Sequence, residues 1–237
     1  MATVILVRHG RTTANANGVL AGRTLGVSLD QVGREQAART GERLAPVPLV
    51  GVVSSPLDRC RETSSLILGQ RPGALVTTVD EGITECDYGQ WQGRSLSELA
   101  QEALWSVVQT QPSAAVFPDG ESLATMQARS VAAIRRRDAH FESEYGPDAV
   151  WVAVSHGDII KSILADALGM HLDLFQRITV GPASVSIVRY GPSRPSVIAT
   201  NTDSGDLSWL RAGAGGADAP VGGGAGPQPH PPAQPWA

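Results

Sequence analysis

Three short apolar runs along the chain predict strands that are buried on both faces. They cover residues 2–7 (ATVILV), 49–53 (LVGVV) and 150–154 (VWVAV), and each run is continuous rather than alternating. Continuous runs of this length are typical of inner strands of a parallel sheet, because helices cover both faces of such a sheet. Each run therefore predicts one strand of a parallel sheet.

Helical periodicity lies between and after these runs. Residues 30–44 carry apolar and polar positions at helical spacing. After the third run an apolar stripe is formed by Ile159, Ile160, Ile163, Leu164, Ala167 and Leu168. Gly169 follows the stripe and predicts the end of that helix. Strands that alternate with helices predict an α/β fold, namely a three-layer α/β/α sandwich with a mostly parallel central sheet.

The composition changes after residue 211. Residues 212–237 consist mostly of Gly, Ala and Pro, with Asp218 as the only charged residue and no apolar periodicity. Such a tract cannot bury enough apolar surface to offset the entropy lost when it becomes ordered. We therefore predict one folded domain over residues 1–211 and a disordered tail over residues 212–237.

The overall charge and the lack of long apolar segments exclude several classes of partner. The chain of 237 residues has a formal net charge of −4, which argues against a nucleic-acid partner. The first apolar run is too short for a signal peptide, and no stretch of about 18 apolar residues predicts a membrane span. We therefore expect a soluble, cytoplasmic protein. Cys60 and Cys86 lack the spacing of a zinc site, and we expect reduced thiols. For Cys60, next to Arg59, we favour a small packed residue over a redox-sensitive one.

Polar residues follow each of the three predicted strands. Arg8 and His9 come directly after the first, Arg59 follows the second, and His156 follows the third. Because the carboxyl ends of parallel strands meet at one edge of a sheet, we expect these side chains to share one pocket. Gly157 opens the next predicted helix, whose N-terminal amides favour an anion. Two guanidinium groups and two imidazoles in an acidic protein predict a site for a phosphoryl group.

The same pocket carries no signature of a metal or cofactor. The sequence has no Walker-type glycine loop and no carboxylate cluster that would hold Mg²⁺. We therefore predict no metal and no cofactor at this site.

Five motifs, in this order along the chain, resemble the histidine phosphatase superfamily in its phosphoglycerate mutase-like branch, branch 1. They are LVRHG at 6–10, SSPLxRxxET at 54–63, ExxxGxWxG at 85–93, GES at 120–122 and VSHG at 154–157. The resemblance covers nearly all of residues 3–205. It implies the α/β fold and a reaction at phosphorus.

The resemblance also implies a role for each catalytic residue. His9 would be the nucleophile that forms a phosphohistidine intermediate. Arg8, Arg59 and His156 would hold the equatorial oxygens and stabilise charge in the transition state. Glu85 would act first as the general acid and then as the general base.

Three further residues would contact the substrate by the same resemblance, and Gly157 is a candidate from its position alone. Asn15 would donate a hydrogen bond to the phosphoryl group, and Gly22 and Arg23 would line the substrate side. Gly157, directly after the second histidine of the site, would let the backbone approach the ligand.

The segment 94–118 separates two reactions within the family. Family mutases resemble one another in an insertion that carries a lysine and an adjacent arginine pair, which hold a bisphosphate. Here the segment is short and Arg94 is its only cation. We therefore expect a phosphomonoesterase that acts on a small phosphorylated metabolite. A phosphoglycerate mutase-type phosphotransferase and a weakly active phosphate-binding protein are the alternatives, and a homodimer is an open possibility.

The high arginine content reflects the composition of the whole chain rather than the predicted phosphoryl site. The chain has 18 arginines and one lysine, Lys161, which is typical of a GC-rich genome. Arg8 and Arg59 belong to the predicted site, and Arg11 and Arg23 are candidates for its rim. We expect the remaining 14, including Arg135, Arg136 and Arg137, to lie on the surface.

Overall fold

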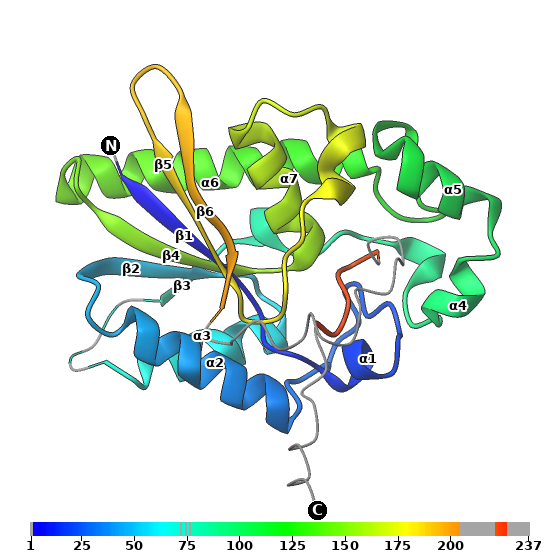
Figure 1. The fold of residues 1–237 in the computed structure, drawn as a ribbon, viewed down its shortest axis with the longest axis horizontal. Coiled ribbons are helices and arrows are strands. Elements are labelled where there is room, and N and C mark those ends of the chain that lie inside the picture. Colours follow the sequence, from blue (N-terminus) through cyan, green and yellow to red (C-terminus); the bar gives the residue numbers. More distant parts are fainter. Residues whose placement is uncertain (1, 72, 74, 76, 204–220, 227–237) are drawn as a thin grey trace, which may run out of the picture.

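Six strands form one sheet in the order β3-β2-β4-β1-β5-β6 (Figure 1). The computed structural model describes residues 2–71, 73, 75, 77–203 and 221–226. The strands are β1 Thr3–Arg8, β2 Leu49–Ser54, β3 Thr77–Val79, β4 Val150–Ser155, β5 Val185–Tyr190 and β6 Pro195–Thr202. Strands β1 to β4 run parallel to one another, whereas β5 pairs antiparallel with both β1 and β6. The predicted mostly parallel sheet is confirmed.

Helices lie on both faces of the sheet (Figure 1). The helices are α1 Thr13–Ala16, α2 Gln31–Leu44, α3 Asp58–Leu68, α4 Leu96–Leu99, α5 Ala103–Thr110, α6 Leu123–Tyr145 and α7 Gly157–Ala167. Four 3₁₀ turns complete the described elements: η1 Glu81–Ile83, η2 Gly89–Trp91, η3 Pro112–Ala114 and η4 Leu172–Arg177. In Figure 1, α2 and α3 lie below the sheet, and α6 and α7 lie above it. The three-layer α/β/α sandwich is therefore confirmed.

The inner strands contribute to two separate apolar cores. Ile5 and Val7 of β1 join the core that faces α2 and α3. Val4 and Leu6, which point to the opposite face, join the larger core that includes residues of α6 and α7. Because side chains alternate across a strand, a strand covered on both faces has to be apolar at every position. This explains the continuous runs in the sequence.

The elements predicted from the sequence agree with the structure to within one or two residues. The three apolar runs correspond to β1, β2 and β4, and the 30–44 pattern corresponds to α2, which Asp30 caps. Gly169 follows α7 with a φ of +67°, as expected for a residue that ends a helix. In the described residues, every helix falls short of the length and apolar character needed to cross a membrane.

Part of the predicted tail lies against the folded domain. Residues 212–220 and 227–237 fall outside the described residues, but residues 221–226 fall within them. Val221 is only 1% exposed and packs in the larger core. The boundary of the domain at residue 211 stays a prediction.

Candidate active site

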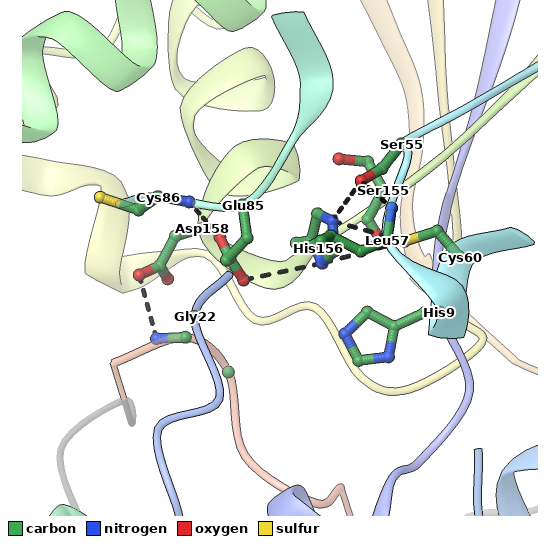
Figure 2. Close-up of polar contacts among 12 residues, drawn as sticks. His9, Gly22, Ser55, Leu57, Cys60, Glu85, Cys86, Ser155, His156 and Asp158 are labelled. Carbon is green, nitrogen blue, oxygen red and sulfur yellow. Dashed lines mark hydrogen bonds and ion pairs between the residues drawn. The ribbon is translucent and has the colours of Figure 1, made fainter. Parts of the chain in front are cut away.

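The residues predicted from the strand ends meet at one edge of the sheet. Arg8 ends β1 and His9 follows it, His156 follows β4, and Arg59 lies in the first turn of α3. Glu85 reaches the same place from the loop between η1 and η2. All five side chains are buried, with at most 2% of each residue exposed. Figure 2 shows His9, Glu85 and His156 close to one another, with Ser55 and Cys60 beside them.

The geometry around His9 fixes which ring nitrogen is free. His9 Nδ1 lies 2.7 Å from the carbonyl oxygen of Gly10. A carbonyl oxygen only accepts hydrogen bonds, so Nδ1 carries the proton and Nε2 carries the lone pair. Arg59 Nε donates to Nε2 across 3.3 Å. Burial, followed by the charges of Arg59 and Arg8, lowers the pKa of His9 well below its ordinary value. His9 is therefore a neutral imidazole with Nε2 as its nucleophilic atom.

The two guanidinium groups each have one buried donor that no described residue accepts. Arg8 donates to the carbonyl oxygens of Val180 and Gly223, both at 2.9 Å, while its Nε has no partner. Arg59 Nη2 donates to Gly22 O at 2.7 Å, while its Nη1 has no partner. Burial lowers the pKa of Arg8 to about 10, which leaves it charged at neutral pH. Buried donors without acceptors are costly, and two beside His9 indicate a site for an anion.

Glu85 has the protonation properties of a general acid. Its Oε1 accepts a hydrogen bond from Cys86 N at 3.0 Å. Burial and, second, the charge of Asp158 raise its pKa to about 7. The carboxyl group is therefore partly protonated at neutral pH, where proton transfer in either direction is efficient.

His156 is held between Ser55 and Glu85. Its Nε2 lies 2.7 Å from Ser55 Oγ, and its Nδ1 lies 3.9 Å from Glu85 Oε2, beyond hydrogen-bond distance. Burial, Arg59 and His9 lower the pKa of His156 well below its ordinary value, so the ring is neutral. The rings of His9 and His156 meet edge to face, with their centroids 5.3 Å apart.

Two arginines hold the backbone of Glu85. Arg23 Nε and Arg129 Nη2 both donate to the Glu85 carbonyl oxygen, at 2.9 and 3.1 Å. Glu121 accepts from both guanidinium groups, at 3.0 Å from Arg23 and 2.9 Å from Arg129 Nε. Arg129 also donates to the carbonyl oxygens of Gly82 and Thr84. Arg129 thus departs from the prediction that it lies on the surface, because its side chain is only 22% exposed.

A pocket that is open to solvent at its mouth lies in front of these residues. It is lined by 15 residues: His9, Thr12, Asn15, Gly18, Val19, Leu20, Ala21, Gly22, Arg59, Glu85, Leu96, Val221, Gly222, Gly223 and Gly224. Five residues predicted from the sequence therefore line it directly.

The other predicted residues lie behind or beside the pocket. Arg8, Arg23, His156 and Gly157 are not among its lining residues. Gly157 starts α7 and is closely packed, since a Cβ there would lie 3.2 Å from Gly222 O. These placements do not test the roles of the residues in catalysis, which stay predictions.

Sequence analysis missed a buried polar cluster next to Glu85. Asp158 is fully buried and accepts hydrogen bonds from Tyr88 Oη at 2.8 Å and from Gly222 N at 3.0 Å. Lys161 Nζ lies 3.4 Å from its other carboxylate oxygen. Asp158 directly follows the VSHG motif, so its position was visible in the sequence. Nothing in the sequence indicates that Tyr88 faces it.

The cysteines and the acidic residues of the described ranges form no metal site. Cys60 and Cys86 are free and buried, and burial raises the pKa of the Cys60 thiol to about 12. The thiol is therefore protonated and unreactive at neutral pH, in agreement with the packing role predicted for it. In the part of the chain that the structure describes, no group of three His, Cys, Asp or Glu residues is arranged to hold a metal ion.

Fold and site together define an α/β enzyme built around a buried neutral histidine and an arginine-lined anion pocket. The family follows from comparison with known proteins. The chain belongs to the histidine phosphatase superfamily (branch 1), whose family model matches residues 4–203. The resemblance inferred from the five motifs is confirmed.

Individual relatives carry both phosphatase and mutase names. Glucosyl-3-phosphoglycerate phosphatase of Mycobacterium tuberculosis is 32% identical over 170 residues, which cover 70% of this chain and 74% of the relative. Probable phosphoglycerate mutase GpmB of Salmonella arizonae is 30% identical over 198 residues, 82% of this chain and 87% of the relative. A solved structure of mycobacterial glucosyl-3-phosphoglycerate phosphatase with VO3 gives a TM-score of 0.76 at 26% identity, covering 85% of this chain and 99% of that one.

Proposed function

We propose that the chain is a metal-independent phosphomonoesterase that acts on a small phosphorylated metabolite through a phosphohistidine. The observation that carries this proposal is the group around His9. A lone pair on Nε2 lies beside two buried arginines, each with one donor free for a phosphoryl oxygen. Positive charge from arginine can take the place of a metal ion in neutralising the phosphoryl group.

The first step transfers the phosphoryl group to the enzyme. His9 Nε2 attacks phosphorus, and the bond between phosphorus and the ester oxygen breaks. Glu85 donates its proton to that oxygen, so the product leaves as a neutral alcohol. Arg8, Arg59 and His156 stabilise the charge that develops on the equatorial oxygens.

The second step releases inorganic phosphate. Water attacks phosphorus, Glu85 now takes a proton from the water, and the bond between phosphorus and Nε2 breaks. A pKa of about 7 suits Glu85 to both tasks, since both of its protonation states are populated near neutral pH.

Hydrolysis is favoured over mutase activity by the segment 94–118, of which Leu96 lines the pocket. Arg94, the only cation of residues 94–118, forms an ion pair with Glu102 at 2.8 Å. Lys161, the only lysine, is 2% exposed and bonds to Gln176. Neither cation is therefore free to hold the second phosphate of a bisphosphate. The name of the M. tuberculosis relative supports a phosphatase, and that of the S. arizonae relative keeps the mutase as the second candidate.

A screen of phosphomonoesters in the presence of a chelator tests the proposal. Wild type is expected to release inorganic phosphate, and His9→Ala is expected to be inactive. The control is His140→Ala, because His140 is an exposed residue on α6. Full activity of His9→Ala would refute the phosphohistidine. Isomerisation that depends on added bisphosphate, without phosphate release, would favour the mutase.

Two further parts of the proposal concern the whole protein. We infer a cytoplasmic location, which fractionation of cells would test, and a homodimer, which light scattering on the purified protein would test. Phosphate binding without turnover of any ester would instead support a phosphate-binding protein.

A further inference from the structure

Residues 221–226, from the far end of the chain, lie beside the catalytic pocket (red-orange in Figure 1), and residues 221–224 line it. Val221 is 1% exposed and packs in the apolar core. Gly222 N donates to Asp158 Oδ2 at 3.0 Å, and the carbonyl oxygen of Gly223 accepts from Arg8 Nη2 at 2.9 Å. The segment is therefore fixed by one apolar anchor and two hydrogen bonds to buried charged groups.

The fit of this segment requires glycine at two positions. Gly222 and Gly223 have φ values of +72° and +74°, which side chains other than glycine rarely adopt. A Cβ on Gly222 would lie 2.8 Å from Leu20 Cδ1, and a Cβ on Gly223 would lie 2.8 Å from Arg8 Cζ. The glycine run thus has a defined shape that complements the pocket, although its composition resembles that of a linker.

The segment occupies groups that the reaction needs. Arg8 and His156 are absent from the lining of the pocket, whereas Val221, Gly222, Gly223 and Gly224 are part of it. Gly223 covers the guanidinium of Arg8, and its carbonyl oxygen takes one of the donors suited to a phosphoryl oxygen. A backbone carbonyl is a neutral acceptor, so a phosphate dianion would bind the same guanidinium more strongly.

We propose that residues 221–224 are an intrachain inhibitor that competes with the phosphoryl group for Arg8. The inference rests on the proposed function, because it takes Arg8 as a ligand of phosphate. Substrate or inorganic phosphate displaces the segment, and part of the binding energy is spent on that displacement. Loosening the segment therefore strengthens phosphate binding.

Calorimetric titration with inorganic phosphate tests this competition in the full-length protein. Val221→Asp replaces the buried anchor with a charge and should release the segment. Burial of a valine side chain corresponds to roughly a tenfold change in an equilibrium constant, so the Kd for phosphate should fall by roughly tenfold. KM for p-nitrophenyl phosphate should fall by a similar factor. Ala225→Ser, in the same segment, is the matched control.

A second variant covers the case in which Val221→Asp does not fold. Gly223→Ala places a methyl group against the guanidinium of Arg8 and should also expel the segment and lower the Kd for phosphate. In the wild type labelled with ¹⁵N-glycine, saturating phosphate should shift the amide resonance of Gly222, because its hydrogen bond to Asp158 is lost.

The outcomes separate the inference from the proposed function. Equal or weaker phosphate binding by both variants would overturn the inhibitor and make the segment a fixed wall of the pocket. An unchanged Gly222 resonance at saturation would also overturn it. No phosphate binding by wild type or either variant would refute the proposed function, and the inhibitor with it.

Discussion

Replacing Glu85 with glutamine should make the protein more stable at alkaline pH while it removes the general acid. The carboxyl group is 2% exposed, and burial, followed by the charge of Asp158, raises its pKa from 4.5 to about 7. The folded state therefore binds this proton more tightly than the unfolded chain does. The resulting contribution to stability is complete below pH 4.5 and is lost as the pH rises through 7.

The size of the effect follows from the difference between the two pKa values. Each unit corresponds to about 1.4 kcal/mol, so burying this group, rather than one that cannot ionise, costs roughly 3 kcal/mol of stability at pH 8 and about 1 kcal/mol at pH 5. Glutamine has the same shape and can still accept the hydrogen bond from Cys86 N, but it carries no charge. Glu85→Gln should therefore exceed the wild type in free energy of unfolding by about these amounts.

Urea denaturation of both proteins at pH 5 and pH 8 measures the effect. The difference in unfolding free energy between wild type and variant removes the contribution of all other titrating groups. Glu35→Gln, which alters an exposed carboxylate on α2, is the control and should show no such pH dependence. A stability difference between wild type and Glu85→Gln that is the same at both pH values would refute the reasoning.

Three further predictions concern groups around the same carboxyl. The value of kcat/KM for the phosphomonoester of an aliphatic alcohol should fall about tenfold per pH unit above pH 7, because such a leaving group needs the proton of Glu85; a flat profile from pH 6 to 9 would contradict this. Arg129→Lys loses the guanidinium group that donates to both Glu121 and the Glu85 carbonyl, so kcat should fall roughly 10- to 100-fold. An unchanged kcat in a variant with the wild-type melting temperature would contradict this positioning role of Arg129. Tyr88→Phe removes a donor from buried Asp158 and should cost about 1–3 kcal/mol of unfolding free energy, measured in urea; wild-type stability would disprove the need for that hydrogen bond.

Much of the framework of the site could be predicted from the sequence, since its key residues follow buried strands. Continuous apolar runs identified β1, β2 and β4, and these are the three central parallel strands. Their carboxyl ends have to share an edge, so Arg8, His9 and His156 came together as expected. The hairpin of β5 and β6 was not predicted. In β6 half-buried and exposed positions alternate, and this gives no continuous apolar run.

The residues that sequence analysis missed share one property, which is a polar contact between distant parts of the chain. Tyr88 and Asp158 are 70 residues apart, and Arg129 is 44 residues from Glu85. Such contacts leave no periodic pattern, because periodicity reports only which face of an element is apolar. The glycine run at 221–226 was missed for a related reason. This segment fits the pocket through its backbone conformation and the side chain of Val221. Neither feature can be recognised from the amino-acid composition of the segment.

The strand order has a consequence for how this protein emerges from the ribosome. Strand β1 pairs only with β4 and β5, so its first partner begins at Val150, about 140 residues after β1 ends. At a synthesis rate of 5–20 residues per second, β1 waits roughly 7 to 30 s without a partner. During that time its apolar side chains and unpaired backbone groups are open to other chains. The central position of β4, which brings His9 and His156 together, thus leaves the nascent chain exposed to aggregation until more than half of the protein has been made.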